Sequence, residues 1–173
     1  TVETFGGLDI LVNNGGKQIY SEDIADLSDE QFDHTFKTNV YAMFWLTKAA
    51  VEHMPPGSTI INTTSIQAYS PSDVLIDYAS TKATINAFTK GIAQQLAPKG
   101  IRANAVAPGP LWTVLQPTDG QPPEKIENFG THTPLGRMGQ PAELAPAYVF
   151  LASAESSYVA GETLNVNGGR PTP

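Results

Sequence analysis

The sequence predicts an α/β fold in which a parallel sheet carries helices on both faces. Short runs rich in β-branched residues, typical of buried strands, recur along the chain. Between them lie segments in which apolar residues recur at helical spacing, and Gly and Pro mark the joins. With 173 residues and 40% hydrophobic content, the chain can bury one sizeable core. We therefore expect a single domain over residues 1–173.

The first expected strand, residues 8–12, is a continuous apolar run of the kind that parallel sheets bury on both faces. It ends in Asn13-Asn14-Gly15-Gly16, which has the composition of a glycine-rich turn from a strand to the next segment. This stretch is the first place where the backbone could approach a ligand closely.

A long helix is expected from Ser28 to about residue 53. Ser28 can cap its start, and the acidic residues that follow favour the helix dipole. Asn39 stands in the middle, where a poor helix former needs a reason, and the pattern alone fits an exposed polar residue equally well. The expected apolar stripe consists of Phe32, Phe36, Val40, Phe44 and Val51.

The remaining elements follow from the same signals. We expect strands at 58–64, 101–107 and 162–166, helices at 78–96 and 141–153, and a loop at 66–77. Residues 114–139 show no clear periodicity and contain four prolines. A segment of this length is too long for an ordinary connection between two elements. We expect a substrate lid in about residues 110–140, with a short helix near residues 123–129.

A candidate active site lies between Ser65 and Lys82. Ser65 follows the second expected strand, and ligands of open α/β sheets bind at the carboxyl ends of strands. Tyr78 and Lys82 are four residues apart on an expected helix, so their side chains leave the same face. A nearby ammonium should lower the pKa of the phenol and so make it useful for proton exchange. A tyrosine and lysine at this spacing are by themselves a weak signal.

The order of these motifs resembles the short-chain dehydrogenase/reductase family. Asn13-Asn14-Gly15-Gly16, Asn39, Ser65, the Tyr78/Lys82 pair and Pro108-Gly109 occur in the family's sequence order, with its Asn-Ser-Tyr-Lys catalytic set. The chain looks most similar to the glucose/ribitol dehydrogenase and aldehyde reductase-like members. The resemblance implies an NAD- or NADP-dependent oxidoreductase that interconverts an alcohol (sugar, polyol or small alcohol) and a carbonyl by hydride transfer.

The resemblance also assigns roles to residues. It implies that Tyr78 is the general acid/base, that Lys82 lowers the tyrosine pKa and orients the nicotinamide ribose, and that Ser65 holds the substrate oxygen. It implies that Asn39 maintains a proton relay at a helix kink. The residues that it places at the cofactor are Asn13, Gly15, Tyr78, Lys82, Pro108, Gly109, Leu111 and Thr113.

The resemblance covers only part of a family member. It implies the C-terminal two-thirds of a doubly wound, Rossmann-type parallel sheet, and no G-x-G-x-x-G motif occurs in the sequence. We expect the N-terminal cofactor-binding part to be missing and the fragment alone to be inactive. Two alternatives stay open: a short protein completed by a partner chain, and a catalytically inactive remnant that serves as an oligomerisation or scaffold subunit. The choice between NAD and NADP is also open.

Composition argues against several classes of partner. Ten basic and seventeen acidic residues give a net charge of −7, without a basic cluster for nucleic acid or anionic lipid. There is no cysteine, and the three histidines are too scattered for a metal site. No signal peptide or membrane span is recognised, so a cytoplasmic location is the default. We expect a small-molecule substrate and a homotetramer formed through the Asn39 and Tyr78 helices.

Overall fold

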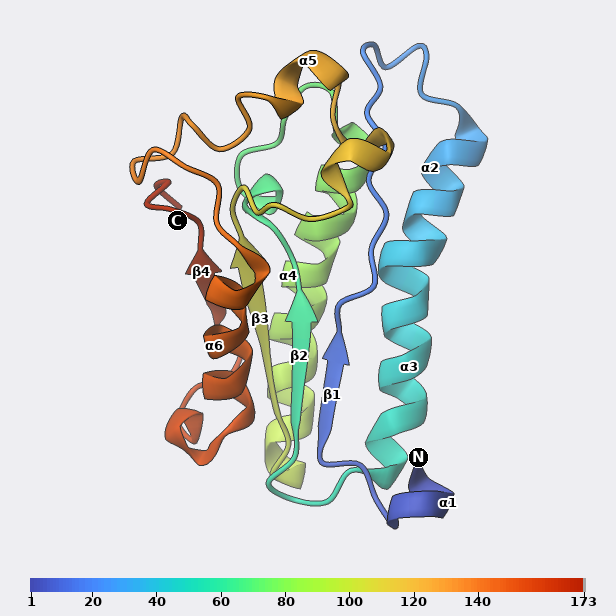
Figure 1. Ribbon diagram of the computed structural model, residues 1–173. Coiled ribbons are helices and arrows are strands. Elements are labelled where there is room, and N and C mark those ends of the chain that lie inside the picture. The colour runs from blue at the N-terminus through green and yellow to red at the C-terminus, as the bar shows by residue number, and fades with distance from the viewer. Residues whose placement is uncertain (173) are drawn as a thin grey trace.

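The computed structural model describes residues 1–172 and contains a four-stranded parallel sheet. Its strands are β1 (Ile10–Asn13), β2 (Thr59–Thr63), β3 (Arg102–Pro108) and β4 (Thr163–Val166), and they lie side by side in sequence order. Each neighbouring pair is parallel (Figure 1). The expected α/β class is therefore confirmed.

Helices connect the strands. The α-helices are α1 (Val2–Phe5), α2 (Asp29–Phe36), α3 (Ala42–Ala50), α4 (Ile76–Leu96), α5 (Pro123–Ile126) and α6 (Pro141–Ala152). Shorter 3-10 and π-helical turns are η1 (Lys37–Tyr41), η2 (Val51–His53), η3 (Ile66–Ala68), η4 (Ala97–Lys99), η5 (Gln116–Gly120) and η6 (Ala154–Ser156). Within the described part of the chain, no helix combines the length and the apolar character needed to cross a membrane.

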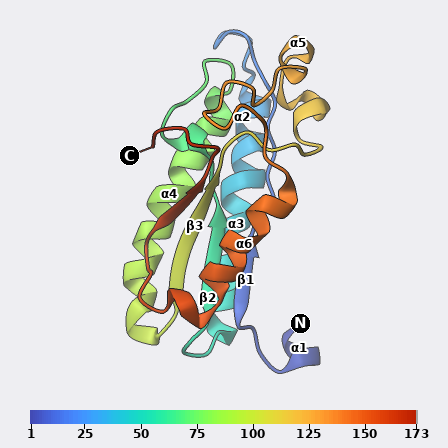
Figure 2. The same cartoon turned by 60° about the vertical axis from the view of Figure 1, so that its left-hand side comes forward.

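The sheet has a layer of helices on each face. α3 and α4 cover one face, and α6 lies across the opposite face (Figure 2). Ile60 and Ile61 in β2 are both fully buried and belong to different core clusters. Ile60 packs with Leu96 of α4, whereas Ile61 packs with Leu151 of α6. The alternation of a strand's side chains thus divides the core into two layers.

The edge strand β1 differs from its prediction. Its continuous apolar run indicated burial on both faces, but Ile10 is 47% exposed and Val12 is 44% exposed. Leu11, between them, packs against the core cluster of α3 and α4. The expectation was wrong for the other face, because α6 makes its main contacts with β2, β3 and β4 and leaves these two side chains of β1 about half exposed.

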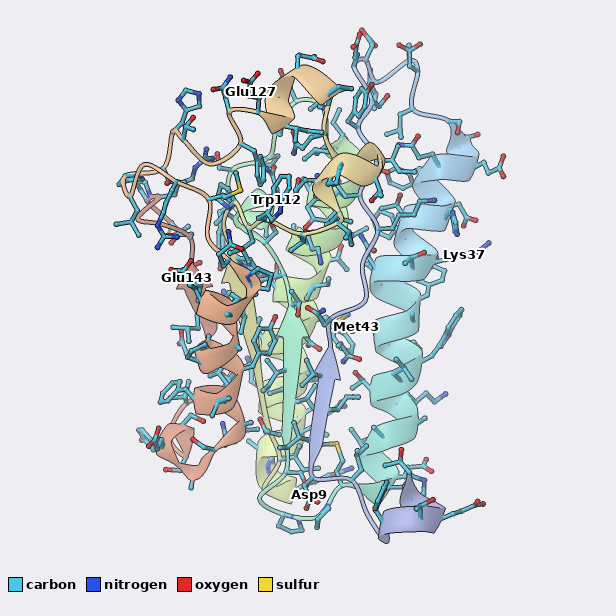
Figure 3. All side chains as sticks on the ribbon, in the orientation of Figure 1. Asp9, Lys37, Met43, Trp112, Glu127 and Glu143 are labelled. Carbon is cyan, nitrogen blue, oxygen red and sulfur yellow. The ribbon has the colours of Figure 1, made fainter. Side chains whose placement is uncertain are left out.

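The long helix is confirmed, but it presents a different face to the core. Ser28 caps it by accepting a hydrogen bond from the Gln31 amide at 3.1 Å. The buried residues recur at intervals of three or four and are mostly small or polar: Thr35, Asn39, Met43, Thr47 and Ala50. Met43 points toward the sheet and Lys37 points away from it (Figure 3). Phe32 and Phe44 of the expected apolar stripe are exposed, so that stripe is not the core face.

Candidate active site

A cavity of about 1090 Å³ lies at the carboxyl ends of the strands. Its walls come from the segments that follow β1, β2 and β3 and from the start of α4. Ser65, Tyr78 and Lys82 all line it, so the structure brings together three of the four catalytic candidates. η5 and α5, from the expected lid segment, lie beyond these strand ends (Figure 1).

Ser65 is positioned by the turn that follows β2. Its backbone is extended, and its Oγ accepts a hydrogen bond from the Gln67 amide at 3.2 Å, which begins the η3 turn. The side chain is buried but lines the cavity. A hydroxyl held in this way can bind an oxygen atom of a ligand without carrying charge.

Tyr78 and Lys82 lie one turn apart on α4. Both side chains are buried, and the Lys82 Nζ lies 5.3 Å from the centre of the Tyr78 ring. Lys82 Nζ also donates to the Thr63 carbonyl at 2.9 Å, which fixes the amine at the end of β2. The predicted pairing on one helix face is therefore present in the fold.

The direction of the pKa shift differs from the expectation. Burial raises the pKa of Tyr78 to about 12, and its hydrogen bond with Ser65 offsets only part of this rise. Burial also lowers the pKa of Lys82 to about 8, so the ammonium is itself disfavoured here. The predicted lowering of the tyrosine pKa was wrong for this geometry because desolvation outweighs the attraction of a nearby cation. Tyr78 is thus a neutral phenol at pH 7.

Asn39 lies in the π-helical turn η1, which accounts for the expected kink. Its Oδ1 accepts from the Lys17 amide at 2.7 Å, and its Nδ2 donates to the Lys17 carbonyl at 2.9 Å and to Thr81 Oγ1 at 3.0 Å. A methyl group at Gly16 would lie 3.6 Å from Lys82 Nζ and 3.7 Å from Asn39 Oδ1. Asn39 therefore positions the backbone at Gly16 and Lys17, which lies close to the Lys82 amine. The role of Asn39 in a proton relay stays a prediction.

Asp77 is a positioning residue that the sequence did not single out. It is 1% exposed, and its Oδ1 accepts from the Tyr78 amide at 2.7 Å. Its Oδ2 accepts from Thr35 Oγ1 at 2.7 Å and from Gln31 Nε2 at 3.4 Å. The carboxylate thus joins the start of α4 to α2 and orients the turn that carries Tyr78. An acidic residue in a helix's first turn was the only available signal, and it is a common one.

Asn13 points into the sheet and is not among the residues that line the cavity in the described chain. Its Nδ2 donates to Asn62 Oδ1 at 2.8 Å and to Thr47 Oγ1 at 3.2 Å. It therefore braces β1 against β2 and α3. Its expected contact with a cofactor ribose stays a prediction.

A second polar contact joins α6 to the lysine site. Thr63 Oγ1 donates to Asn14 Oδ1 at 2.9 Å and lies 2.6 Å from the Tyr148 hydroxyl. The carbonyl of the same Thr63 accepts from Lys82. Tyr148 and Asn14 consequently fix the backbone position that holds the amine, and neither was predicted.

The other expected cofactor residues line the cavity. They are Gly15, Pro108, Gly109, Leu111 and Thr113. Gly109 is required by packing, because a Cβ there would lie 2.6 Å from the Asn167 Cα. A methyl group at Gly15 would meet nothing within 4 Å, so this wall is open. A rigid turn, an open glycine wall and the buried hydroxyl and amine groups fit a flat ring that carries a hydroxylated sugar. The residues present therefore fit a nicotinamide riboside.

The segment over the cavity is joined to α6 by an ion pair. Arg137 Nη2 lies 2.6 Å from Glu143 Oε1, and this guanidinium holds the pKa of Glu143 down to about 2. In Figure 3, Glu143 lies at the start of α6, with Trp112 and Glu127 on the segment over the strand ends. The short helix expected near residues 123–129 is present as α5. Among residues 1–172, no group of acidic, cysteine or histidine side chains could hold a metal ion.

Comparison with known proteins gives consistent matches. The family model described as enoyl-(acyl carrier protein) reductase matches residues 1–170. An uncharacterized oxidoreductase of Escherichia coli, YghA, is 57% identical over 96% of this chain and 57% of its own length. Glucose and ribitol dehydrogenase of Daucus carota is 49% identical, with 97% and 57% covered, respectively. NADPH-dependent aldehyde reductase 1 of Arabidopsis thaliana is 50% identical, with 97% and 58% covered. The chain thus spans less than three fifths of these relatives.

Solved structures are also similar. Aldohexose dehydrogenase of Thermoplasma acidophilum superposes with a TM-score of 0.88 at 31% identity, over 99% of this chain and 73% of that one. A short-chain dehydrogenase of Burkholderia cenocepacia in complex with NADP gives a TM-score of 0.89 at 32% identity, over 97% of this chain and 67% of that one.

Proposed function

Because the chain belongs to the short-chain dehydrogenase/reductase family, we propose that it interconverts an alcohol and a carbonyl compound, using NAD or NADP. The observation that carries this proposal is the placement of Ser65, Tyr78 and Lys82 on the wall of one cavity at the strand ends. Each of these three side chains is buried, and each lines the cavity, so a substrate bound there would contact all three.

The chemistry follows from the states of these residues. A bound nicotinamide would supply or accept the hydride. In the reducing direction, the neutral Tyr78 phenol gives its proton to the substrate carbonyl oxygen, and the Ser65 hydroxyl donates a hydrogen bond to the same oxygen. Lys82 lies beside the tyrosinate that results and stabilises its charge when protonated. A tyrosine pKa of about 12 favours the proton-donating form, which suits carbonyl reduction at neutral pH.

The substrate class is proposed from the named relatives. One is a glucose and ribitol dehydrogenase and another is an aldehyde reductase. Sugars, polyols and small aldehydes are therefore the substrates to test first, with both NAD and NADP.

The rival function is an inactive subunit that serves in oligomerisation. The exposed face of β1 favours it, since Ile10 and Val12 could be covered by another chain. The presence of all four catalytic candidates favours an enzyme, because a subunit that only assembles has no need for a buried lysine beside a buried tyrosine.

The test is cofactor binding and turnover by two forms of the protein. We expect residues 1–173 alone to bind NAD and NADP much more weakly than a version extended upstream, because residues 1–173 contain no G-x-G-x-x-G motif to receive the pyrophosphate. We expect aldehyde reduction only by the extended version. Calorimetry and a coupled absorbance assay measure the two quantities. Micromolar binding by residues 1–173 would contradict the need for an upstream segment, and an extended version that binds cofactor without turnover would favour the inactive subunit.

Self-association is proposed through α3 and α4. Trp45 is 58% exposed and Phe44 is 45% exposed on α3, and Tyr41 and Leu46 are exposed beside them. The rings of Phe44 and Phe88 pair edge to face at 6.4 Å, which extends this apolar surface onto α4. Large exposed apolar patches usually mark an interface.

A charge in this surface should weaken the association. We expect Trp45→Glu to raise the dissociation constant by about 30-fold or more, because buried tryptophans at interfaces are often energetic hot spots. Sedimentation and light scattering over a range of concentrations measure the change. Ile24→Glu, which places the same charge at an exposed apolar residue on another segment, is the control. Equal effects of the two variants would show that the assembly does not form through α3.

Three further expectations stay predictions. They are the closing of residues 110–140 over the substrate, a tetrameric assembly and a cytoplasmic location.

A further inference from the structure

Gln67 is a half-buried glutamine that lines the candidate active-site cavity beside Ser65. It lies in the η3 turn that follows β2, and its backbone amide donates to Ser65 Oγ at 3.2 Å. The same short turn therefore fixes the Ser65 hydroxyl and carries a second polar group on the wall of the cavity.

One side of the Gln67 side-chain amide is anchored by the loop that follows the turn. Gln67 Oε1 accepts a hydrogen bond from the Ser72 backbone amide at 2.6 Å. A backbone amide can only donate, so the side-chain oxygen, and not the NH2 group, must lie toward Ser72. The orientation of the side-chain amide is thus set, and its Nε2 lies on the other side.

The Nε2 of Gln67 carries two N–H donors that the protein leaves available. It pairs with no acceptor among the described residues, whereas Gln18, another glutamine of the cavity, uses its Nε2 to donate to the Gly120 carbonyl. Gln67 Nε2 is also not one of the unpaired polar atoms that are sealed from solvent. Because Ser65 and Ser72 on either side line the same cavity, a ligand bound there can reach these donors.

A donor pair in this position discriminates between ligands. A ligand that covers an amide N–H without offering an acceptor leaves the donor unpaired and binds more weakly, whereas a ligand oxygen within reach keeps the donor paired. Sites built to form such a hydrogen bond reject analogues that lack the matching group more strongly than apolar pockets reject a change in size. An amide that is already held by a second hydrogen bond also loses little side-chain freedom on binding.

The wall around Gln67 indicates which kind of oxygen fits. The residues that the loop 65–75 contributes to the described lining are all uncharged, and the polar ones beside Gln67 are Ser65, Ser70 and Ser72. The cationic lining residues Lys125 and Arg170 come from other segments. A carboxylate binds most strongly beside a cation, whereas a neutral amide donor on an uncharged wall suits a neutral oxygen. The acceptor expected at Gln67 is therefore a hydroxyl.

We propose that Gln67 donates a hydrogen bond to a substrate hydroxyl other than the one that reacts, and so selects polyhydroxylated substrates over simple alcohols and aldehydes. This rests on the proposed function, since it assumes that a carbonyl or alcohol carbon lies at Ser65 and Tyr78. Gln67 is then a residue that determines specificity and takes no part in proton transfer.

The test compares glyceraldehyde with propanal, which has the same carbon chain without the two further hydroxyls, in the shortest form of the protein that reduces aldehydes. We expect kcat/KM to be about tenfold to a hundredfold higher for glyceraldehyde. Gln67→Met keeps the length of the side chain but removes the donor, and we expect it to lower this ratio about tenfold or more. A general disturbance of the Ser65 turn would slow both aldehydes and leave the ratio unchanged.

Gln67→Glu separates the donor from the anchor. Its carboxylate still accepts from the Ser72 amide but presents an oxygen where the NH2 group was. The substrates for this variant are methoxyacetaldehyde and butanal, which differ only by an ether oxygen in place of a methylene and have no hydroxyl to donate. We expect Gln67→Glu to lower the ratio of kcat/KM for methoxyacetaldehyde to that for butanal about tenfold or more, because two acceptor oxygens then face each other.

Gln121→Met is the matched control, because Gln121 lines the same cavity from a different segment. We expect it to change each ratio less than twofold. Either ratio unaffected by its Gln67 variant, or lowered as much by Gln121→Met, overturns the assignment to Gln67. Should Gln67→Met fail to fold by circular dichroism, Gln67→Glu still decides, and equal kcat/KM values for glyceraldehyde and propanal in the unmodified protein also overturn it. A protein that binds cofactor but reduces none of the four aldehydes contradicts the proposed function and, with it, this inference.

Discussion

Replacing Tyr78 by phenylalanine is expected to lower turnover by about 10²–10⁴-fold, the usual contribution of a positioned general acid or base. The variant loses only the hydroxyl, because the phenyl ring fills the same buried position on α4. Folding and cofactor affinity should therefore change little. Steady-state kinetics with the preferred aldehyde, calorimetry and thermal melting measure the three quantities.

Tyr158→Phe is the control, since Tyr158 is fully exposed. It removes the same atom from the surface and should leave turnover unchanged. A Tyr78→Phe variant whose turnover is within a factor of two of the unmodified protein would contradict the role of Tyr78. A loss of turnover together with a loss of folding would instead indicate a structural role.

Replacing Lys82 by methionine is expected to reduce turnover by about 10²-fold and yet stabilise the fold near neutral pH. Burial lowers the pKa of Lys82 from its ordinary value of 10.5 to about 8. Because the pKa is lower in the folded state, the destabilisation is absent above pH 10.5 and complete once the pH has fallen below 8. A difference of this size corresponds to about 3–4 kcal/mol when the destabilisation is complete. Methionine removes this term.

The sign of the change in the free energy of unfolding caused by Lys82→Met can be measured by urea unfolding at pH 6 and pH 10. We expect the stability of Lys82→Met relative to the unmodified protein to be about 2–3 kcal/mol more favourable at pH 6 than at pH 10. Comparing the two pH values isolates the titration of Lys82, because contributions that do not change with pH, such as altered packing, are the same at both. Lys90→Met, at an exposed position of the same helix, is the control and should show no such difference. A relative stability that is the same at both pH values would contradict the burial of an ionisable amine.

The Lys82→Met variant would also separate the effect of this side chain on stability from its effect on turnover. A lysine held in the interior destabilises the protein at the pH at which it acts, and function is the usual reason for keeping such a group. The gain in stability and the loss of turnover are therefore expected together.

The order of elements could be predicted from local sequence, and the catalytic candidates from local motifs together with the family resemblance. Strand and helix periods, the Ser28 cap and the spacing of Tyr78 and Lys82 depend on neighbouring residues, and the structure has each of them. The short helix near residues 123–129 was also predicted, with the family resemblance as support, and the structure has α5 there.

Which faces are covered, and by what, depended on contacts between distant residues. Apolar residues in β1 and in the long helix suggested buried surfaces, yet Val12 and Phe44 are exposed because no described helix covers them. The inward face of that helix instead consists of small and polar residues such as Thr35 and Asn39, which hydrogen-bond to α4 and to the segment after β1. Periodicity identifies the faces of an element but not the partner of each face.

The sequence by itself determined the fold class and the approximate positions of the strands, because these follow from local patterns, and its resemblance to a family singled out Ser65, Tyr78 and Lys82 as candidates. Only the tertiary structure decided that Asp77 orients Tyr78, that Gln18 donates to the Gly120 carbonyl of η5 and that burial raises the tyrosine pKa. Each of these depends on which atoms from distant segments surround a polar group and on how far that group is removed from water. Solvation and hydrogen bonding are properties of the packed molecule, so they cannot be read from the spacing of residues along the chain.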